Sequence, residues 1–89
     1  MKKKYPSQLK QFGNRIKDLR LESGLTQAQF AKQSGISIRT IQRTEAGEFA
    51  ASLNIVFALA DAFRIRPDEL LLNIDLAKSA IIKTKKNSL

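Results

Sequence analysis

The side chains best suited to chemistry lie between positions 38 and 46. On a helical wheel of residues 37–46, Ile41, Thr44 and Glu45 share one side. The opposite side carries hydrogen-bonding and apolar side chains, namely Ile38, Arg39, Gln42, Arg43 and Ala46. Arginine can form two hydrogen bonds with guanine, glutamine can form two with adenine, and an apolar side chain can contact the thymine methyl group. This side therefore has the residue types that read base edges in the major groove.

The same pattern has a plainer interpretation, because arginine and glutamine also occur on helix faces that only contact water. Ile38 weakens that interpretation, since an apolar residue outside the core side gains little from exposure to water. It could still pack locally against Ile36 or Gln42. We therefore take Ile38, Arg39, Gln42 and Arg43 as the candidate base-reading residues.

Three further polar residues are candidates for contact with phosphate groups. Gln27 is expected at the first position of a helix, where free backbone N–H groups point outward, so its amide could help to hold a phosphate. It could equally do no more than complete the start of that helix. Ser37 and Thr40 are first of all cap and first-turn residues, with phosphate contact as a second use.

Glu45 is a carboxylate on the side of its segment that also carries Ile41. A buried charge requires a partner of opposite sign. The nearest candidate is Arg20, which follows the apolar Leu19 near the end of an earlier helix. We expect an internal ion pair between Arg20 and Glu45 that joins two helices and takes no part in chemistry.

Short helices must position these residues, and no stretch of the middle of the chain shows the alternating pattern of a strand. The first helix is predicted to begin after Pro6, with Ser7 as its N-cap, and to end near Ser23 before Gly24. Its apolar residues recur every three or four positions, as in one buried face: Leu9, Phe12, Ile16 and Leu19.

The second and third helices are joined by about three residues. Thr26 begins a capping box for the second helix, which ends at Gly35. Ser37 is the N-cap of the third helix, which runs to Gly47. Two helices that meet in so short a turn, centred on a glycine, are typical of a helix-turn-helix.

Two more helices complete the predicted domain. Ser52 caps a fourth helix that is apolar around much of its circumference, so we expect it to be the most buried element. A fifth helix begins at Pro67, and Asp68 and Glu69 follow at the positive end of its dipole.

The chain has 89 residues and a formal net charge of +8, which favours a polyanionic partner. The charge is concentrated at the two ends, where eight lysines face Asp75: Lys2, Lys3, Lys4, Lys10, Lys78, Lys83, Lys85 and Lys86. Floppy basic tails could therefore account for it as well. We divide the chain into a basic arm (residues 1–6), a helical domain (7–73) and a C-terminal extension (74–89). Apolar residues in the extension fall partly at helical spacing, before a frayed basic tail.

The sequence contains no cysteine and no histidine. Disulfides, thiolate chemistry, histidine metal sites and imidazole catalysis are therefore excluded, and the carboxylates form no catalytic cluster. We expect a protein that is not an enzyme and that uses no metal or cofactor. The basic start is like that of a signal peptide, but polar residues follow where a signal peptide requires an apolar core. No apolar run approaches the ~18 residues of a membrane span. We therefore expect a cytoplasmic protein without a membrane partner.

A series of short motifs runs from Phe12 to Leu72. They are Arg15-Ile16, Leu19-Arg20, Gly24-Leu25-Thr26-Gln27, Phe30-Ala31, Ser34-Gly35-Ile36-Ser37, Ile41, Glu45, Gly47, Leu59-Ala60 and Pro67-Asp68-Glu69-Leu70-Leu71. Together they resemble the lambda-repressor-like helix-turn-helix family of DNA-binding domains, also called XRE or Cro-type. The resemblance covers all five predicted helices, and it implies a compact, all-α, five-helix domain.

The resemblance also implies roles for individual residues. The third helix would lie in the major groove, the position matching Gln27 would bind phosphate, and those matching Ile38, Arg39 and Arg43 would face bases. It further implies the pairing of Arg20 with Glu45. This chain departs from many members after its glycine, where Glu48-Phe49-Ala50-Ala51 replaces basic or polar phosphate-binding residues.

We therefore predict a sequence-specific transcriptional regulator, more specifically a repressor, that binds double-stranded DNA as a homodimer on an inverted repeat. The main alternative is an antitoxin-type DNA-binding protein whose residues 74–89 neutralise a protein partner. A third possibility is a basic module for RNA or a membrane surface, whose binding would disappear with salt and show no site preference.

Overall fold

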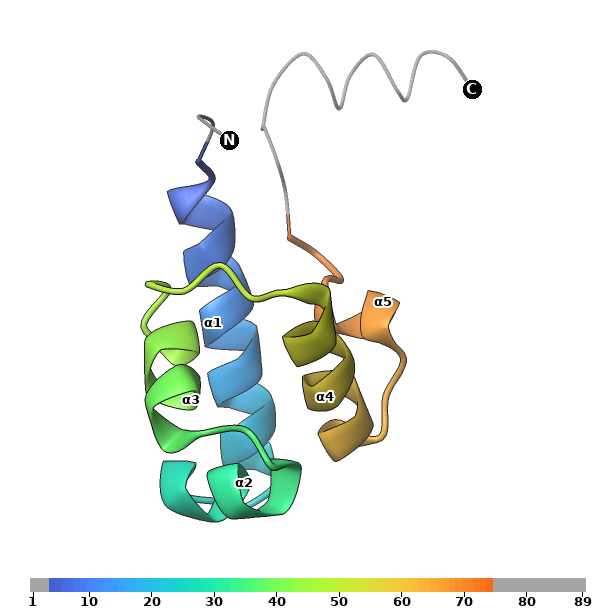
Figure 1. Cartoon of the computed structure of the whole chain (residues 1–89). Coiled ribbons are helices and arrows are strands. Elements are labelled where there is room, and N and C mark those ends of the chain that lie inside the picture. Colours follow the sequence, from blue (N-terminus) through green and yellow to red (C-terminus); the bar gives the residue numbers. More distant parts are fainter. Residues whose placement is uncertain (1–3, 75–89) are drawn as a thin grey trace.

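The computed structural model describes residues 4–74, which form five helices and no strand (Figure 1). They are α1 (Pro6–Glu22), α2 (Gln27–Ser34), α3 (Ile38–Glu45), α4 (Leu53–Phe63) and α5 (Pro67–Leu70). The predicted all-α, five-helix class is confirmed. The helical spacing and the basic tail predicted after residue 74 lie outside the described residues, as do the first three residues of the arm.

The first helix begins earlier than predicted. Tyr5 is the N-cap residue and Pro6 is the first helical residue, so the expected N-cap role of Ser7 is wrong. Proline suits this position because its missing N–H would have no partner in the first turn and its φ is already close to the helical value. The hydroxyl of Ser7 instead lies inside the helix, where it accepts a hydrogen bond from Gln11 at 3.3 Å.

The predicted boundaries around α2 and α3 depend on local hydrogen bonds. The hydroxyl of Thr26 accepts from the backbone N–H of Gln29 at 3.0 Å, and the Gln29 side chain accepts from the N–H of Thr26 at 2.9 Å. Gly35 ends α2 with φ 76°, in the left-handed region that favours glycine. Ser37 then caps α3 by accepting from the N–H of Thr40 at 3.1 Å. A capped helix, a three-residue turn and a second capped helix form the predicted helix-turn-helix.

The five helices enclose one apolar core to which each contributes. α1 contacts α3 and α5, while α2 contacts α3 and α4, and α4 in turn contacts α5. The contacts thus run around the core in a closed circuit, with α1 at the centre of the view in Figure 1. The buried apolar residues are Phe12, Ile16, Phe30, Ile36, Ile41, Leu59, Ala60 and Leu70.

A glycine that the sequence analysis did not single out allows α1 and α3 to pack closely. A Cβ atom at Gly13 would collide with the backbone carbonyl oxygens of Thr44 and Glu45. Only a residue without a side chain therefore allows this helix crossing. The last turn of α3 is thus held directly against the middle of α1.

The expectation that the fourth helix is the most buried element is wrong. Only Leu59 and Ala60 of α4 are buried, whereas Leu53 is 71% exposed and Phe57 is 52% exposed. A helix that is apolar all round needs neighbours all round, and within residues 4–74 α4 packs mainly against α2 and α5. One apolar side of α4 is therefore left in contact with solvent.

Candidate nucleic-acid interface

The two sides of α3 have opposite environments, as the wheel predicted. Ile41, Thr44 and Glu45 are buried, and Glu45 is only 8% exposed. The capped start of α3 and its close crossing with α1 fix the rotation of the helix about its axis. The opposite side must therefore face outward.

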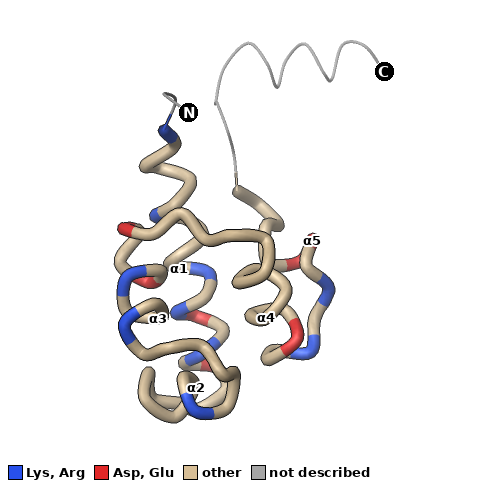
Figure 2. Tube along the Cα trace, viewed as in Figure 1, with Lys and Arg blue, Asp and Glu red and all other residues tan. Residues whose placement is uncertain are grey.

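The outward side of α3 brings the four candidate base-reading residues together. Arg39, Gln42 and Arg43 are exposed, and Ile38 is 41% exposed at the start of the helix. Figure 2 shows basic residues along the edge of α3 that faces away from the other helices. Ile38 adds a solvent-exposed apolar side chain at one end of this row. The row thus offers hydrogen-bond donors, an amide and an apolar group in a line, which is the chemistry that base edges require.

The buried side of α3 carries the ion pair expected from the sequence. Nε of Arg20 donates to Oε2 of Glu45 at 2.7 Å, and Nη2 donates to Oε1 at 3.0 Å. Nη1 of Arg20 also donates to the carbonyl oxygen of Leu25 at 2.8 Å. The pKa of Arg20 is raised above its ordinary value chiefly because Glu45 accepts these hydrogen bonds. The pair joins α1, the α1–α2 turn and α3, and so holds the outward face in place.

Gln27 is attached to the same carboxylate. Its amide nitrogen Nε2 donates to Oε1 of Glu45 at 3.1 Å. An amide nitrogen has two hydrogens, so one N–H remains after this contact. This hydrogen bond to Glu45 orients the side chain of Gln27, which is the first residue of α2.

The start of α3 contains a second oriented polar group. The hydroxyl of Ser37 accepts from the backbone of Thr40 and donates to the hydroxyl oxygen of Thr40 at 2.9 Å. Because Thr40 accepts in this pair, its own O–H remains available as a donor. Ser37 is primarily the cap, and Thr40 is the residue of the two whose hydroxyl keeps a hydrogen for a further partner.

Phe49 is a neighbour of the outward face that the sequence analysis did not identify as a site residue. Cζ of Arg43 lies over its ring, 5.7 Å from the centroid. The sequence signal was the glycine that ends the third helix with an aromatic residue two positions later. In the sequence this segment stands out only because it lacks the basic or polar residues that bind phosphate in many family members.

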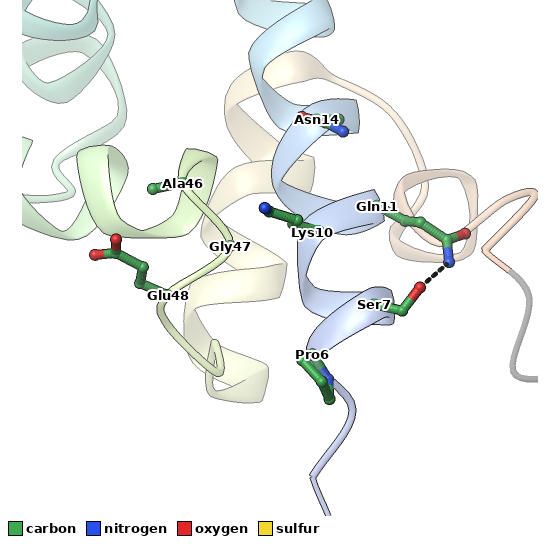
Figure 3. Close-up of a pocket in the computed structure, with 8 residues that line it drawn as sticks. All are labelled: Pro6, Ser7, Lys10, Gln11, Asn14, Ala46, Gly47 and Glu48. Carbon is green, nitrogen blue, oxygen red and sulfur yellow. Dashed lines mark hydrogen bonds between the residues drawn. The ribbon is translucent and has the colours of Figure 1, made fainter.

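An open hollow of about 610 Å³ is lined by residues from the first turns of α1 and from the end of α3 (Figure 3). Polar and small side chains line it, namely Pro6, Ser7, Lys10, Gln11, Asn14, Ala46, Gly47 and Glu48. A Cβ atom on Gly47 would lie 2.8 Å from Cγ of Lys10, so these two segments meet directly. Lys10 thus places a positive charge near the carboxyl end of α3, which complements the helix dipole.

Other classes of site lack support in the part of the chain that is described. No group of three or more acidic, cysteine or histidine residues in residues 4–74 could hold a metal ion. Over the same range, no helix has the length and apolar content needed to cross a membrane.

Comparisons with known proteins identify the family of the chain. A family model described as helix-turn-helix matches residues 16–70. An uncharacterised HTH-type transcriptional regulator from Archaeoglobus fulgidus is 34% identical over 56 residues, which cover 63% of this chain and 80% of that protein. A second one, from Methanocaldococcus jannaschii, is 32% identical over 62 residues, which cover 70% of this chain and 94% of that protein.

A solved structure also matches. It is the restriction-modification controller protein C.AhdI from Aeromonas hydrophila, with a TM-score of 0.67 and 37% sequence identity over 70% of this chain and 94% of that one. The family match begins within α1 and spans α2, α3, α4 and α5. The chain therefore belongs to the lambda-repressor-like, or XRE-type, helix-turn-helix family of DNA-binding domains.

Proposed function

We propose that this protein is a transcriptional regulator that binds a specific double-stranded DNA site as a homodimer and represses transcription there. The observation that carries the proposal is the outward side of α3, where Arg39, Gln42 and Arg43 lie in a row that begins at Ile38. The major groove is wide enough to accept an α-helix, and base pairs are fully distinguishable there. The names of the two archaeal relatives and of the controller protein support a role in gene regulation.

Each residue of the row has a matching base chemistry. Arg39 and Arg43 can each form two hydrogen bonds with guanine, and Gln42 can form two with adenine. Ile38 can contact a thymine methyl group. These four residues decide which sequence is preferred, because contacts to base edges differ between base pairs and contacts to phosphates do not.

The amino ends of α2 and α3 supply the contacts that set the position of the protein on the duplex. Gln27 has one N–H left after its bond to Glu45, and Thr40 has a free O–H. Both lie near helix starts, where backbone N–H groups and the helix dipole favour a negatively charged group. We assign Gln27 and Thr40 to phosphate contact, and Ser37 primarily to the cap with phosphate contact as its second use.

A dimer follows from affinity. One recognition helix reads only a few base pairs, which gives too little discrimination against the non-specific sites of a genome. Two copies related by a twofold axis can place their α3 helices about 34 Å apart, in successive major grooves on one side of an inverted repeat. α5 and the residues after it offer the surface for this, because Leu71 and Leu72 are exposed while Leu70 is buried.

Repression is the simplest consequence of such binding. A dimer seated across an inverted repeat blocks other proteins from the same DNA, and it needs no further contact to do so. Activation would need an additional surface for a second protein. The exposed leucines also keep open the antitoxin alternative, in which a protein partner covers them together with residues 74–89.

Selection of binding sites from random DNA tests the proposal when it is repeated at two salt concentrations. The expected result is an enriched inverted repeat with half-site centres about 10 base pairs apart, recovered at both salt concentrations. Recovery of unrelated sequences whose binding disappears at the higher salt would instead identify a sequence-blind basic module. A second protein that co-purifies with the chain in stoichiometric amount would favour the antitoxin alternative.

A further inference from the structure

The segment after α3 places an aromatic ring against one of the base-reading candidates. The guanidinium carbon of Arg43 lies over the ring of Phe49, 5.7 Å from its centroid. A guanidinium at this distance is attracted by the negative face of the ring. Arg39 lies one turn earlier on the same side of α3, and the described residues include no ring contact with it.

Backbone hydrogen bonds hold the chain just before Phe49 against the turn of α3 that carries Arg43. The N–H of Glu48 donates to the carbonyl oxygen of Arg43 at 2.9 Å, and the N–H of Gly47 donates to that of Thr44 at 3.0 Å. Gly47 has φ 75°, so the pattern is the Schellman motif that closes many helices. Phe49 follows directly after this closed turn. Its backbone is therefore tied to the helix turn from which Arg43 projects.

Phe49 and Arg43 differ in exposure, as expected if the ring positions the arginine and the arginine contacts a base. Phe49 is partly buried, so the protein itself restricts the ring. Arg43 is exposed, so its outer side remains open to a ligand. A long side chain that is already held loses less conformational freedom when it binds.

Contact between a guanidinium and the face of a ring can leave the N–H donors of the arginine free. The guanidinium is flat, and its N–H groups point outward in its own plane. Contact with a ring uses the flat face of the group, whereas two hydrogen bonds to guanine use its edge. One arginine can therefore contact a ring and a guanine at the same time.

We propose that Phe49 is a positioning residue for base recognition, which holds Arg43 so that its N–H edge faces a guanine in the major groove. The inference rests on the proposed base-reading role of Arg43, and it assigns no DNA contact to the ring itself. Arg43 then makes a more selective contact than Arg39, which has no such support.

The test is a set of variants measured on the selected site and on random DNA. Phe49→Leu keeps the apolar bulk without the ring, and Phe49→Tyr keeps the ring. We expect Phe49→Leu to weaken binding to the selected site by about two- to fivefold and to leave random DNA unchanged. Phe49→Tyr should bind like the parent protein. Thermal unfolding monitored by circular dichroism checks that each variant folds.

Double variants separate the inference from the proposed function. In the Arg43→Ala background, Phe49→Leu should cause no further loss, whereas in the matched Arg39→Ala background it should cause the same loss as in the parent. The inference is overturned if Phe49→Leu binds as well as or better than the parent, or loses equally on both DNAs or in both backgrounds. If Arg43→Ala itself leaves site preference unchanged, base reading by Arg43 fails and the inference fails with it.

Discussion

α3 and the α4–α5 region place charge and apolar surface in opposite ways. α3 buries Glu45 against Arg20 and leaves polar side chains outside. In the other region the buried residues are apolar, and Leu53, Phe57 and Leu72 remain exposed. Its ion pair, between Arg66 and Asp68, lies on the surface with both side chains mostly exposed.

The difference indicates which ligand each region can accept. A row of donors held by a buried ion pair suits a polyanion whose groups must be met at fixed positions. Burial of exposed leucines and a phenylalanine against another apolar surface is favourable, because it removes these side chains from water. We infer that α3 contacts DNA and that the α4–α5 region contacts another protein surface, which in the proposed dimer belongs to a second copy.

The largest expected effect concerns the buried side of α3. Glu45→Ala would leave Arg20 charged and buried without its carboxylate, so we expect a loss of about 3–5 kcal/mol in the free energy of unfolding. Denaturant unfolding measures this loss, and Glu48→Ala, an exposed carboxylate three residues later, is the matched control with a change within about 0.5 kcal/mol. Equal stability of the two variants would contradict the structural role of the pair. Replacing both partners with apolar residues should cost less than Glu45→Ala alone.

Substitutions on the exposed side of α3 should change the affinity for DNA without changing the stability of the fold. Arg39→Ala and Arg43→Ala should each cost about 1–3 kcal/mol in binding to the selected site and much less on random DNA. Fluorescence anisotropy with labelled duplexes measures both affinities. Equal losses on the two DNAs would show that these arginines bind phosphate rather than bases.

Substitutions in the α4–α5 region should change the dissociation constant of the dimer. Phe57→Lys and Leu72→Lys should each weaken the dimer by about tenfold or more, because each places a charge in an interface that needs apolar contact. Neither should lower the stability of the monomer by much, since both residues are exposed. Leu21→Lys is the control, since Leu21 is an exposed leucine of α1. Sedimentation of the three variants would contradict the proposed interface if all had the same dissociation constant.

A smaller effect is expected at the start of α2. Gln27→Ala should weaken binding to every DNA sequence alike, by about 1 kcal/mol, because it removes a phosphate contact that carries no sequence information. Gln33→Ala, an exposed glutamine near the end of the same helix, should change nothing. A loss confined to the selected site would move Gln27 to the base-reading group.

The smallest effect concerns the surface ion pair at the start of α5. The hydrogen bond from Arg66 holds the pKa of Asp68 below its ordinary value of 3.8. A carboxyl with a lowered folded pKa adds stability above its unfolded pKa, and this is lost as the pH falls through the folded pKa. The Asp68→Asn variant should therefore have the stability of the parent at a pH below the folded pKa of Asp68, and a slightly lower stability above about pH 4. Melting temperatures between pH 2 and pH 6 measure this, and a difference that persists at the lowest pH would exclude titration of Asp68 as its cause.

Local signals in the sequence determined most of the fold. Hydroxyl residues before helices, glycines after them and apolar residues at helical spacing depend on neighbours within a few positions, so the sequence shows them directly. The structure places Thr26, Ser37 and Ser52 at the caps predicted for them. The start of α1 was misplaced because Pro6 and Ser7 both carry a valid start signal, and the sequence alone did not decide between them.

The sequence alone also determined the two sides of α3, because a helix of known register fixes which residues share a side. It also suggested Arg20 as the partner of Glu45, because Arg20 follows the apolar Leu19 near the end of the first helix.

Tertiary structure decided the rest. The exposure of Leu53 and Phe57 depends on how many helices surround α4, and the need for glycine at position 13 depends on how closely α3 crosses α1. The contact between Arg43 and Phe49 requires the turn at Gly47 to bring two side chains together outside any regular repeat. These features arise from distances between separate segments, and periodicity within one segment carries no information about them.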